Sequence, residues 1–157
     1  MPRNQSGMWF EEFEVGQVVE HAVTRTITES DNVFFTALTM NTQPMHLDAD
    51  YSSRQEFRRP LVNSMFTVAL VVGLSVYETT LGTTVANLGF EKVEFPHPLF
   101  HGDSVHVETE ITATRESKSR PNVGIVTFEH RGFNQRDELV CTAVRTAMMR
   151  RRPSGTS

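Results

Sequence analysis

The chain has 157 residues, of which 38% are hydrophobic and 22% are charged, and its formal net charge is -4. This length suits one domain, and the composition is that of a folded globular protein, too apolar for a disordered one. The acidic balance, with a pI of about 5.8, lacks the basic footprint that a nucleic-acid-binding protein needs.

Cysteine usage and apolar segments bear on the compartment. Cys141 is the only cysteine, so no internal disulfide can form, which fits a reducing compartment. The first residues lack the apolar core of a signal peptide, and the longest apolar segment, residues 65–76, is shorter than the ~20 residues that cross a bilayer. We expect a cytoplasmic protein with one domain over residues 1–157, in which about 150–157 form a flexible basic tail.

The first third of the chain predicts a strand followed by short helices. Residues 18–28 are rich in β-branched residues and alternate loosely, as strands do. Thr28, followed three residues later by Asp31, is typical of a capped helix start. The apolar residues at helical spacing in that helix are Phe34, Phe35 and Leu38. Residues 47–57 predict a second short helix, for which Asp48 is a candidate cap.

The middle of the chain predicts one long apolar helix over residues 64–80, with Gly82 as its stop. Apolar residues occur all around this helix, a pattern typical of a helix buried on most sides.

The remaining residues change to the period of strands. Segments 83–95, 103–117, 122–133 and 138–149 predict long strands with short connections, hence an antiparallel sheet. In the second of them, the inward face is predicted to hold Val105, Val107, Ile111 and Ala113. One apolar helix wrapped by an antiparallel sheet is an α+β architecture, the hot-dog fold. Its exposed sheet edges favour pairing across a two-fold axis, so we expect at least a homodimer.

Two motifs carry the chemistry. Residues 41–46 read NTQPMH, and residues 59–65 read RPLVNSM. They resemble, without gaps, the D-x-N-P-[aliphatic]-H and R-P-[aliphatic]-V-H-G-M motifs of the MaoC-like dehydratases, which include the R-specific enoyl-CoA hydratases. The resemblance covers nearly the whole chain and implies the reversible hydration of an enoyl-CoA thioester at a CoA tunnel between subunits.

The resemblance also implies roles for single residues. His46 keeps its place as the acid–base, whereas Asn41 replaces the family's aspartate and is left to orient water or a substrate carboxylate. Ser64 replaces the glycine whose backbone N–H binds the thioester oxygen. The remaining motif residues are predicted to bind substrate: Gln43, Asn63, Met65 and Arg59. CoA is carried within the substrate, so no cofactor, metal, nucleic acid or membrane is implied, and the expected assembly is a homodimer or a dimer of dimers.

The chemistry of these side chains sets a problem. An imidazole, with an ordinary pKa of ~6.5, can take a proton from water near neutral pH. An N–H at the start of a helix, where the dipole is positive, can stabilise an enolate oxygen. Asn41 can hydrogen-bond but cannot accept a proton, so the second proton-transfer group of the family is missing.

Three explanations stay open for this loss. His46 could perform both proton transfers; the substrate could carry its own carboxylate, which an aspartate would repel; or the site could be inactive and only bind. We favour the second explanation, combined with the first. Relatives with this kind of loop point towards branched C5 diacyl thioesters such as itaconyl-, mesaconyl- or methylmalyl-CoA. The alternatives in function are a non-catalytic acyl-CoA-binding partner subunit and a thioesterase.

Several candidate residues also have plain structural interpretations. His46 could close the turn after Pro44, Asn41 could serve only as a turn residue, and Ser64 lies in no G-x-S-x-G nucleophile motif. The arginines of this region, Arg54, Arg58 and Arg59, could form a solvated face. His97 and His101 stand four apart beside prolines, which argues against a helical zinc site.

Overall fold

The structure, a computed structural model, describes residues 7–153. Its elements in chain order are η1 (Phe10–Glu12), β1 (Val18–Glu20), β2 (Arg25–Thr26), α1 (Glu29–Leu38), α2 (Pro44–Leu47), α3 (Ala49–Ser53), α4 (Ser64–Thr79), β3 (Thr84–Glu94), β4 (Ser104–Glu116), β5 (Val123–Phe133) and β6 (Leu139–Arg150). None of the helices within residues 7–153 is long and apolar enough to cross a membrane.

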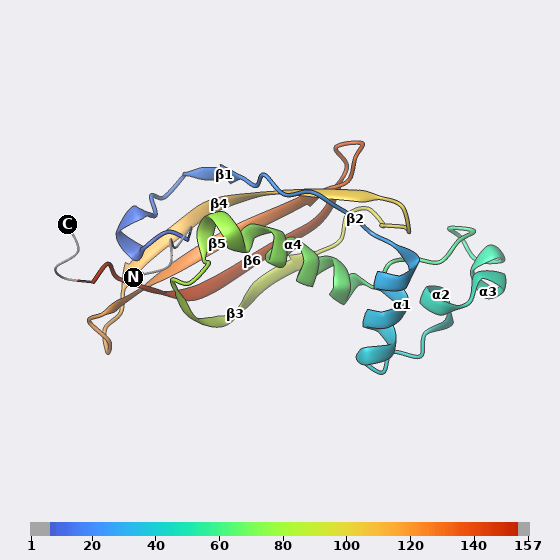
Figure 1. Cartoon of the computed structure of the whole chain (residues 1–157), viewed down its shortest axis with the longest axis horizontal. Helices are drawn as coiled ribbons and strands as arrows, with labels where there is room; N and C mark the ends of the chain where they lie inside the picture. Colours follow the sequence, from blue (N-terminus) through green and yellow to red (C-terminus); the bar gives the residue numbers. More distant parts are fainter. Residues whose placement is uncertain (1–6, 154–157) are drawn as a thin grey trace, which may run out of the picture.

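The strands form one antiparallel sheet in the order β1-β4-β5-β6-β3, and β2 also pairs with β4. Helix α4 lies along one face of this sheet, and the short helices α1, α2 and α3 gather at one end of the long axis (Figure 1). The described part of the chain, residues 7–153, begins and ends toward the opposite end of the molecule. The α+β architecture with a sheet around a central helix is therefore confirmed.

The predicted helix signals are present as hydrogen bonds. Thr28 and Asp31 form a reciprocal capping box at the start of α1. Asp48 caps α3 by accepting from the N–H of Tyr51 (2.9 Å). After α4, Gly82 takes a left-handed φ of 78°, a conformation that glycine adopts without a Cβ penalty.

The helix predicted over 47–57 is the shorter α3, and three expectations about the sheet and the central helix also differ from the structure. The strand predicted over 18–28 is two short strands, because the chain leaves the sheet at His21, whose side chain turns inward to Glu78. Ala113 is exposed, because a register shift between Ile111 and Ala113 ends the alternation of β4. In the described chain α4 is not buried on most sides.

The buried stripe of α4 is Thr67, Val71, Ser75 and Thr79, spaced four apart. This stripe faces the sheet: a Cβ at Gly132 in β5 would lie 2.5 Å from Val71 Cγ2. The other faces of the helix are half-buried or exposed in one chain, as at Met65 (52%) and Tyr77 (59%). An apolar helix with one covered face requires another surface to cover the rest.

The core consists of two apolar clusters. One, near α1–α3, contains Ile27, Val62, Val71, Leu99, Val105, Val107, Val140, Cys141 and Ala143. The other, near the chain ends, contains Phe13, Ile111, Val126, Phe128, Ala147 and Met149. Burial raises the pKa of the Cys141 thiol to about 11, so this cysteine is an inert core residue.

A network of largely buried hydrogen bonds links β6, β5 and β4 to His21 and α4. Arg145 Nε–H donates to His130 Nε2 (2.8 Å), and His130 Nδ1 lies 2.7 Å from Thr109 Oγ1. The same hydroxyl lies 2.7 Å from His21 Nε2, whose Nδ1 lies 2.8 Å from the Glu78 carboxylate. A guanidinium only donates, so His130 Nε2 accepts and His130 Nδ1–H donates to Thr109 Oγ1. A carboxylate only accepts, so His21 Nδ1–H donates to Glu78. His130 is thereby neutral, with its proton on Nδ1.

This hydrogen-bond network predicts that acid lowers the stability of the fold. Burial, and then the charge of Arg145, hold the pKa of His130 well below its ordinary 6.5. Below ~pH 6.5 the unfolded chain therefore binds a proton that the folded chain does not. The free energy of unfolding is expected to fall by ~1.4 kcal/mol for each pH unit below this point, as measured by urea unfolding between about pH 7 and about pH 5.

The matched control is His130→Gln, whose side-chain oxygen can accept from Arg145 and whose NH2 can donate to Thr109. This variant cannot titrate, so its unfolding free energy is expected to change less over the same pH range. Equal slopes for the two proteins would show that His130 is not the origin of the acid sensitivity.

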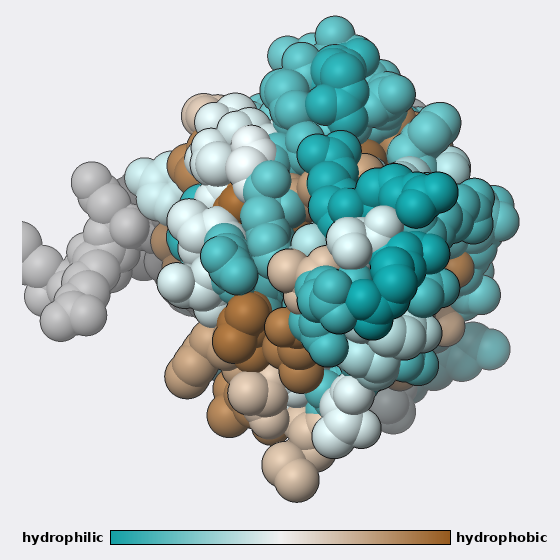
Figure 2. Space-filling model, turned by 90° about the vertical axis from the view of Figure 1, so that its right-hand side faces the viewer, coloured by the Kyte–Doolittle hydropathy of each residue, from teal (hydrophilic) through white to brown (hydrophobic). Residues whose placement is uncertain are grey.

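Besides those of α4, exposed apolar side chains gather around α1 and along the β3 edge. On and after α1 they are Val33, Phe34, Leu38 and Met40, and along the β3 edge they are Leu88, Phe90 and Phe95. Figure 2 shows hydrophobic surface gathered low on the face that carries α1. Of the three apolar residues at helical spacing in α1, Phe34 and Leu38 are 71% and 70% exposed. The third, Phe35, packs against the ring of Phe66.

The basic run near the C-terminus is held by ion pairs and is not a free tail. Arg150 ends β6, Arg151 pairs with Glu11 and Glu116, and Arg152 pairs with Glu12. The rest of the predicted tail, 154–157, lies outside the described residues.

Candidate active site

His46 is held in one orientation by the backbone that follows α3. Pro44 begins α2, which suits proline because its missing N–H is not needed at a helix start, and His46 lies in the single turn that follows. The ring is 8% exposed, and its Nδ1 lies 2.8 Å from the carbonyl oxygen of Leu61. A carbonyl only accepts, so Nδ1 carries the proton and Nε2 of the neutral ring keeps a free lone pair.

Asn41 follows a residue with an unusual backbone. Met40 has a φ of 58°, in the left-handed region that side chains other than glycine seldom adopt. The Asn41 N–H donates to the Thr36 carbonyl (3.0 Å), and its Oδ1 accepts from the N–H of Gln43 (3.0 Å). The Asn41 side chain therefore stabilises the turn before Pro44. Because its Oδ1 accepts from the Gln43 N–H, its NH2 group points away from Gln43. That group accepts no proton and can only donate.

Ser64 is the first residue of α4, at the positive end of a 16-residue helix. The preceding Asn63 caps the helix by accepting from the N–H of Met65 (3.0 Å). No described residue accepts a hydrogen bond from the Ser64 N–H, which is one of the donors that a helix start leaves free. This N–H can serve an anionic oxygen.

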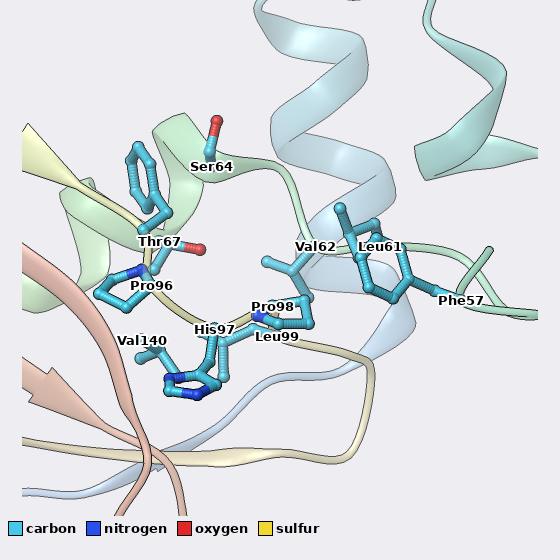
Figure 3. A pocket seen from close by; sticks show the side chains of 11 residues that line it. Phe57, Leu61, Val62, Ser64, Thr67, Pro96, His97, Pro98, Leu99 and Val140 are labelled. Carbon is cyan, nitrogen blue, oxygen red and sulfur yellow. The ribbon is translucent and has the colours of Figure 1, made fainter.

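A pocket of about 260 Å³ opens beside this helix start (Figure 3). Ser64 and Thr67 project from the first turn of α4, and Phe57 and Leu61 line the pocket from the preceding segment, opposite residues 96–99. Neither Asn41 nor His46 lines it in one chain. Leu61 connects the pocket to His46, because its side chain lines the pocket and its carbonyl oxygen accepts from the His46 ring.

The predicted substrate-binding residues have different surroundings. Gln43 precedes α2 and is exposed, as is Met65, and the Arg59 guanidinium lies 3.6 Å above the Phe100 ring. Asn63 differs from its predicted role. It is 3% exposed and its amide is occupied by the cap and by Thr36 Oγ1 (3.2 Å), so it is part of the scaffold.

The other candidates take structural places. Arg54 pairs with Asp50 across one helical turn on the surface, and Arg58 donates to the Ser53 carbonyl. His97 lines the pocket and donates from Nδ1 to the Leu139 carbonyl (2.9 Å). The His101 ring turns to α1, where its Nε2 lies 3.0 Å from Asn32 Nδ2.

Two buried residues of α1 that the sequence did not predict connect the segments of the site. The buried residues of α1 are Asn32 and Thr36, four apart, and both are fully buried. Thr36 contacts the Asn41 N–H and the Asn63 amide, and Asn32 contacts segments that carry His46 and Asn63. A polar pair at helical spacing just before the NTQPMH loop was the available signal.

The comparisons with known proteins agree with the motifs. Residues 11–132 match the family described as MaoC like domain. The chain belongs to the MaoC-like family. Its hot-dog fold is shared with a Mycobacterium tuberculosis protein that has a double hotdog fold, with a TM-score of 0.86 at 22% identity over 97% of this chain and 47% of that one. The predicted family and fold are both confirmed.

Two curated relatives of this MaoC-like protein differ in length. The beta-methylmalyl-CoA dehydratase of Chloroflexus aurantiacus is 29% identical over 150 residues, 96% of this chain but 42% of that protein. The (R)-specific enoyl-CoA hydratase of Aeromonas caviae is 33% identical over 129 residues, 82% of this chain and 90% of that protein. The chain thus spans less than half of the first relative and nearly all of the second.

Proposed function

We propose that this MaoC-like protein reversibly hydrates an enoyl-CoA thioester, and that His46 is its acid–base. The observation that carries the proposal is the bond from His46 Nδ1–H to the Leu61 carbonyl, which leaves Nε2 as a free base. The unpaired N–H of Ser64 at the start of α4 supplies the second requirement, a donor for the enolate oxygen.

The proposed reaction balances with these two groups. His46 Nε2 takes a proton from water, the hydroxide oxygen bonds to the β-carbon, and the electron pair of the double bond moves to the thioester oxygen as an enolate. The Ser64 N–H stabilises that negative charge. The proton on Nε2 then returns to the α-carbon and the thioester carbonyl reforms. One imidazole thus serves as base and acid, and Asn41 orients water or substrate.

The substrate we propose has a branched acyl group with a carboxylate, of the itaconyl-, mesaconyl- or methylmalyl-CoA type. Support comes from the methylmalyl-CoA dehydratase relative and from the Asn41 NH2, a neutral donor where the family motif has a negative charge. CoA enters as part of the substrate, and no separate cofactor is proposed.

We further propose a cytoplasmic homodimer or dimer of dimers. The exposed β3 edge and the uncovered faces of α4 are surfaces that a second copy would bury. His46 and the pocket are adjacent but not continuous in one chain, which a second copy completing the site would explain. The rival function, a non-catalytic partner subunit, is favoured by the loss of the motif aspartate at Asn41.

A panel of enoyl thioesters with and without a terminal carboxylate tests the proposal. The purified protein alone is expected to remove the ultraviolet absorbance of the conjugated thioester, fastest for branched, carboxylated substrates, without releasing free thiol. Activity that requires a second protein would favour the partner subunit, and free thiol would favour a thioesterase.

A further inference from the structure

The side chain of Asn32 joins three segments of the site. It is fully buried in α1. Its Oδ1 accepts from the Asn63 N–H (2.8 Å), and its Nδ2 donates to the Leu61 carbonyl (3.1 Å). The same nitrogen lies 3.4 Å from the His46 carbonyl and 3.0 Å from His101 Nε2. The Asn63 N–H only donates and the carbonyls only accept, so the amide has one possible orientation.

One end of this amide acts on the base. The Leu61 carbonyl accepts from both Asn32 Nδ2 and His46 Nδ1. The bond from Asn32 holds the carbonyl in the direction that receives the imidazole proton. The position of the Leu61 carbonyl therefore decides the tautomer of His46, and the bond from Asn32 fixes that position.

The other end acts on the oxyanion donor. The Asn63 N–H is bound by Asn32 Oδ1, and the Asn63 side chain caps α4 at the Met65 N–H. With both groups of Asn63 fixed, the direction of the next backbone N–H, that of Ser64, is set as well. The Asn32 side chain is thus linked through hydrogen bonds to the segments that position His46 and the Ser64 N–H.

We propose that Asn32 is a positioning residue that couples the His46 base to the Ser64 oxyanion donor. The proposal rests on the proposed hydratase function. Asn32 reaches neither group directly; it acts through the Leu61 carbonyl and the Asn63 backbone. Pre-set geometry of this kind affects rate strongly, since a displacement of about 1 Å can cost ~10²-fold.

The test is Asn32→Asp. The variant keeps an oxygen for the Asn63 N–H but places a second oxygen against the Leu61 carbonyl, where a donor is needed. We expect kcat to fall by ~10–100-fold while KM changes by less than about threefold, because substrate contacts are unchanged. Asn32→Ser, small enough to admit water, is expected to lower kcat in the same way and serves if the aspartate variant does not fold.

The matched control is Asn134→Asp, the same change at another fully buried asparagine, in the β5–β6 turn. It is expected to lower the melting temperature but to keep kcat within about twofold. An equal loss of kcat in both variants, or none in Asn32→Asp and Asn32→Ser, would overturn the positioning role.

A second readout is independent of activity. In nitrogen-15 spectra of the labelled histidines, with His46 assigned through His46→Gln, the wild type is expected to show the Nδ1–H form. The Asn32 variants are expected to show a mixture with Nε2–H, and an unchanged tautomer would overturn the proposal. If the wild type hydrates no thioester of the panel, the hydratase proposal fails, and this spectrum alone decides the role of Asn32.

Discussion

Replacing His46 by alanine is expected to lower kcat for enoyl-CoA hydration by ~10²–10⁴-fold, the range that a lone general acid–base supplies. The loss is expected near the top of that range, because Asn41 cannot accept a proton and no second group can take over. The measurement is the rate of disappearance of the conjugated thioester absorbance at saturating substrate, with KM determined in parallel.

Two further variants make this result specific. His46→Gln keeps a donor for the Leu61 carbonyl and much of the ring volume but has no base, so it is expected to be as inactive as the alanine variant. His106→Ala removes a histidine that stacks on Phe133 and is 40% exposed in its side chain, and it is expected to leave kcat within about twofold. Substantial activity in His46→Gln would show that the imidazole is not the proton carrier.

The parts of the fold that sequence predicted are those encoded by local signals. The capping box at Thr28, the cap at Asp48 and the stop at Gly82 each act within a few residues, and each is present. The alternation of β4 holds until the bulge after Ile111, which depends on pairing with β5 and has no local signal. The break at His21 likewise depends on a partner, Glu78, that lies far along the chain.

The site divides in the same way. The motif predicts His46, Asn41 and Ser64 as site residues, and the structure adds the hydrogen bonds on which their proposed roles are argued. The motif did not reveal that the Asn63 side chain caps α4, nor that Asn32 hydrogen-bonds to the segments that carry His46 and Asn63. Both facts depend on contacts between segments that are distant in sequence. In α1 the apolar residues Phe34 and Leu38 face outward and the polar Asn32 and Thr36 are buried, which is the reverse of the usual amphipathic pattern.

Substituting Asn41 by aspartate is expected to reverse the proposed substrate preference of the protein. The turn survives the change, because aspartate keeps the oxygen that accepts from the Gln43 N–H, and only the NH2 group becomes a negative oxygen. Two like charges at ~4 Å repel by ~4 kcal/mol at an effective dielectric of about 20, which corresponds to several-hundred-fold in binding. A substrate with its own carboxylate is therefore expected to lose up to that factor in kcat/KM.

A simple substrate such as crotonyl-CoA carries no such charge and is expected to react faster in the same variant, because the new carboxylate adds a second proton acceptor to the loop that carries His46. The quantity to measure is the ratio of kcat/KM for a carboxylated enoyl thioester to that for crotonyl-CoA, in wild type, Asn41→Asp and Asn41→Ala. The alanine variant has neither donor nor charge, so its ratio is expected to lie between the other two. A ratio that rises in Asn41→Asp would mean that the asparagine does not face the acyl carboxylate, and the choice of substrate would then have to come from groups other than this loop.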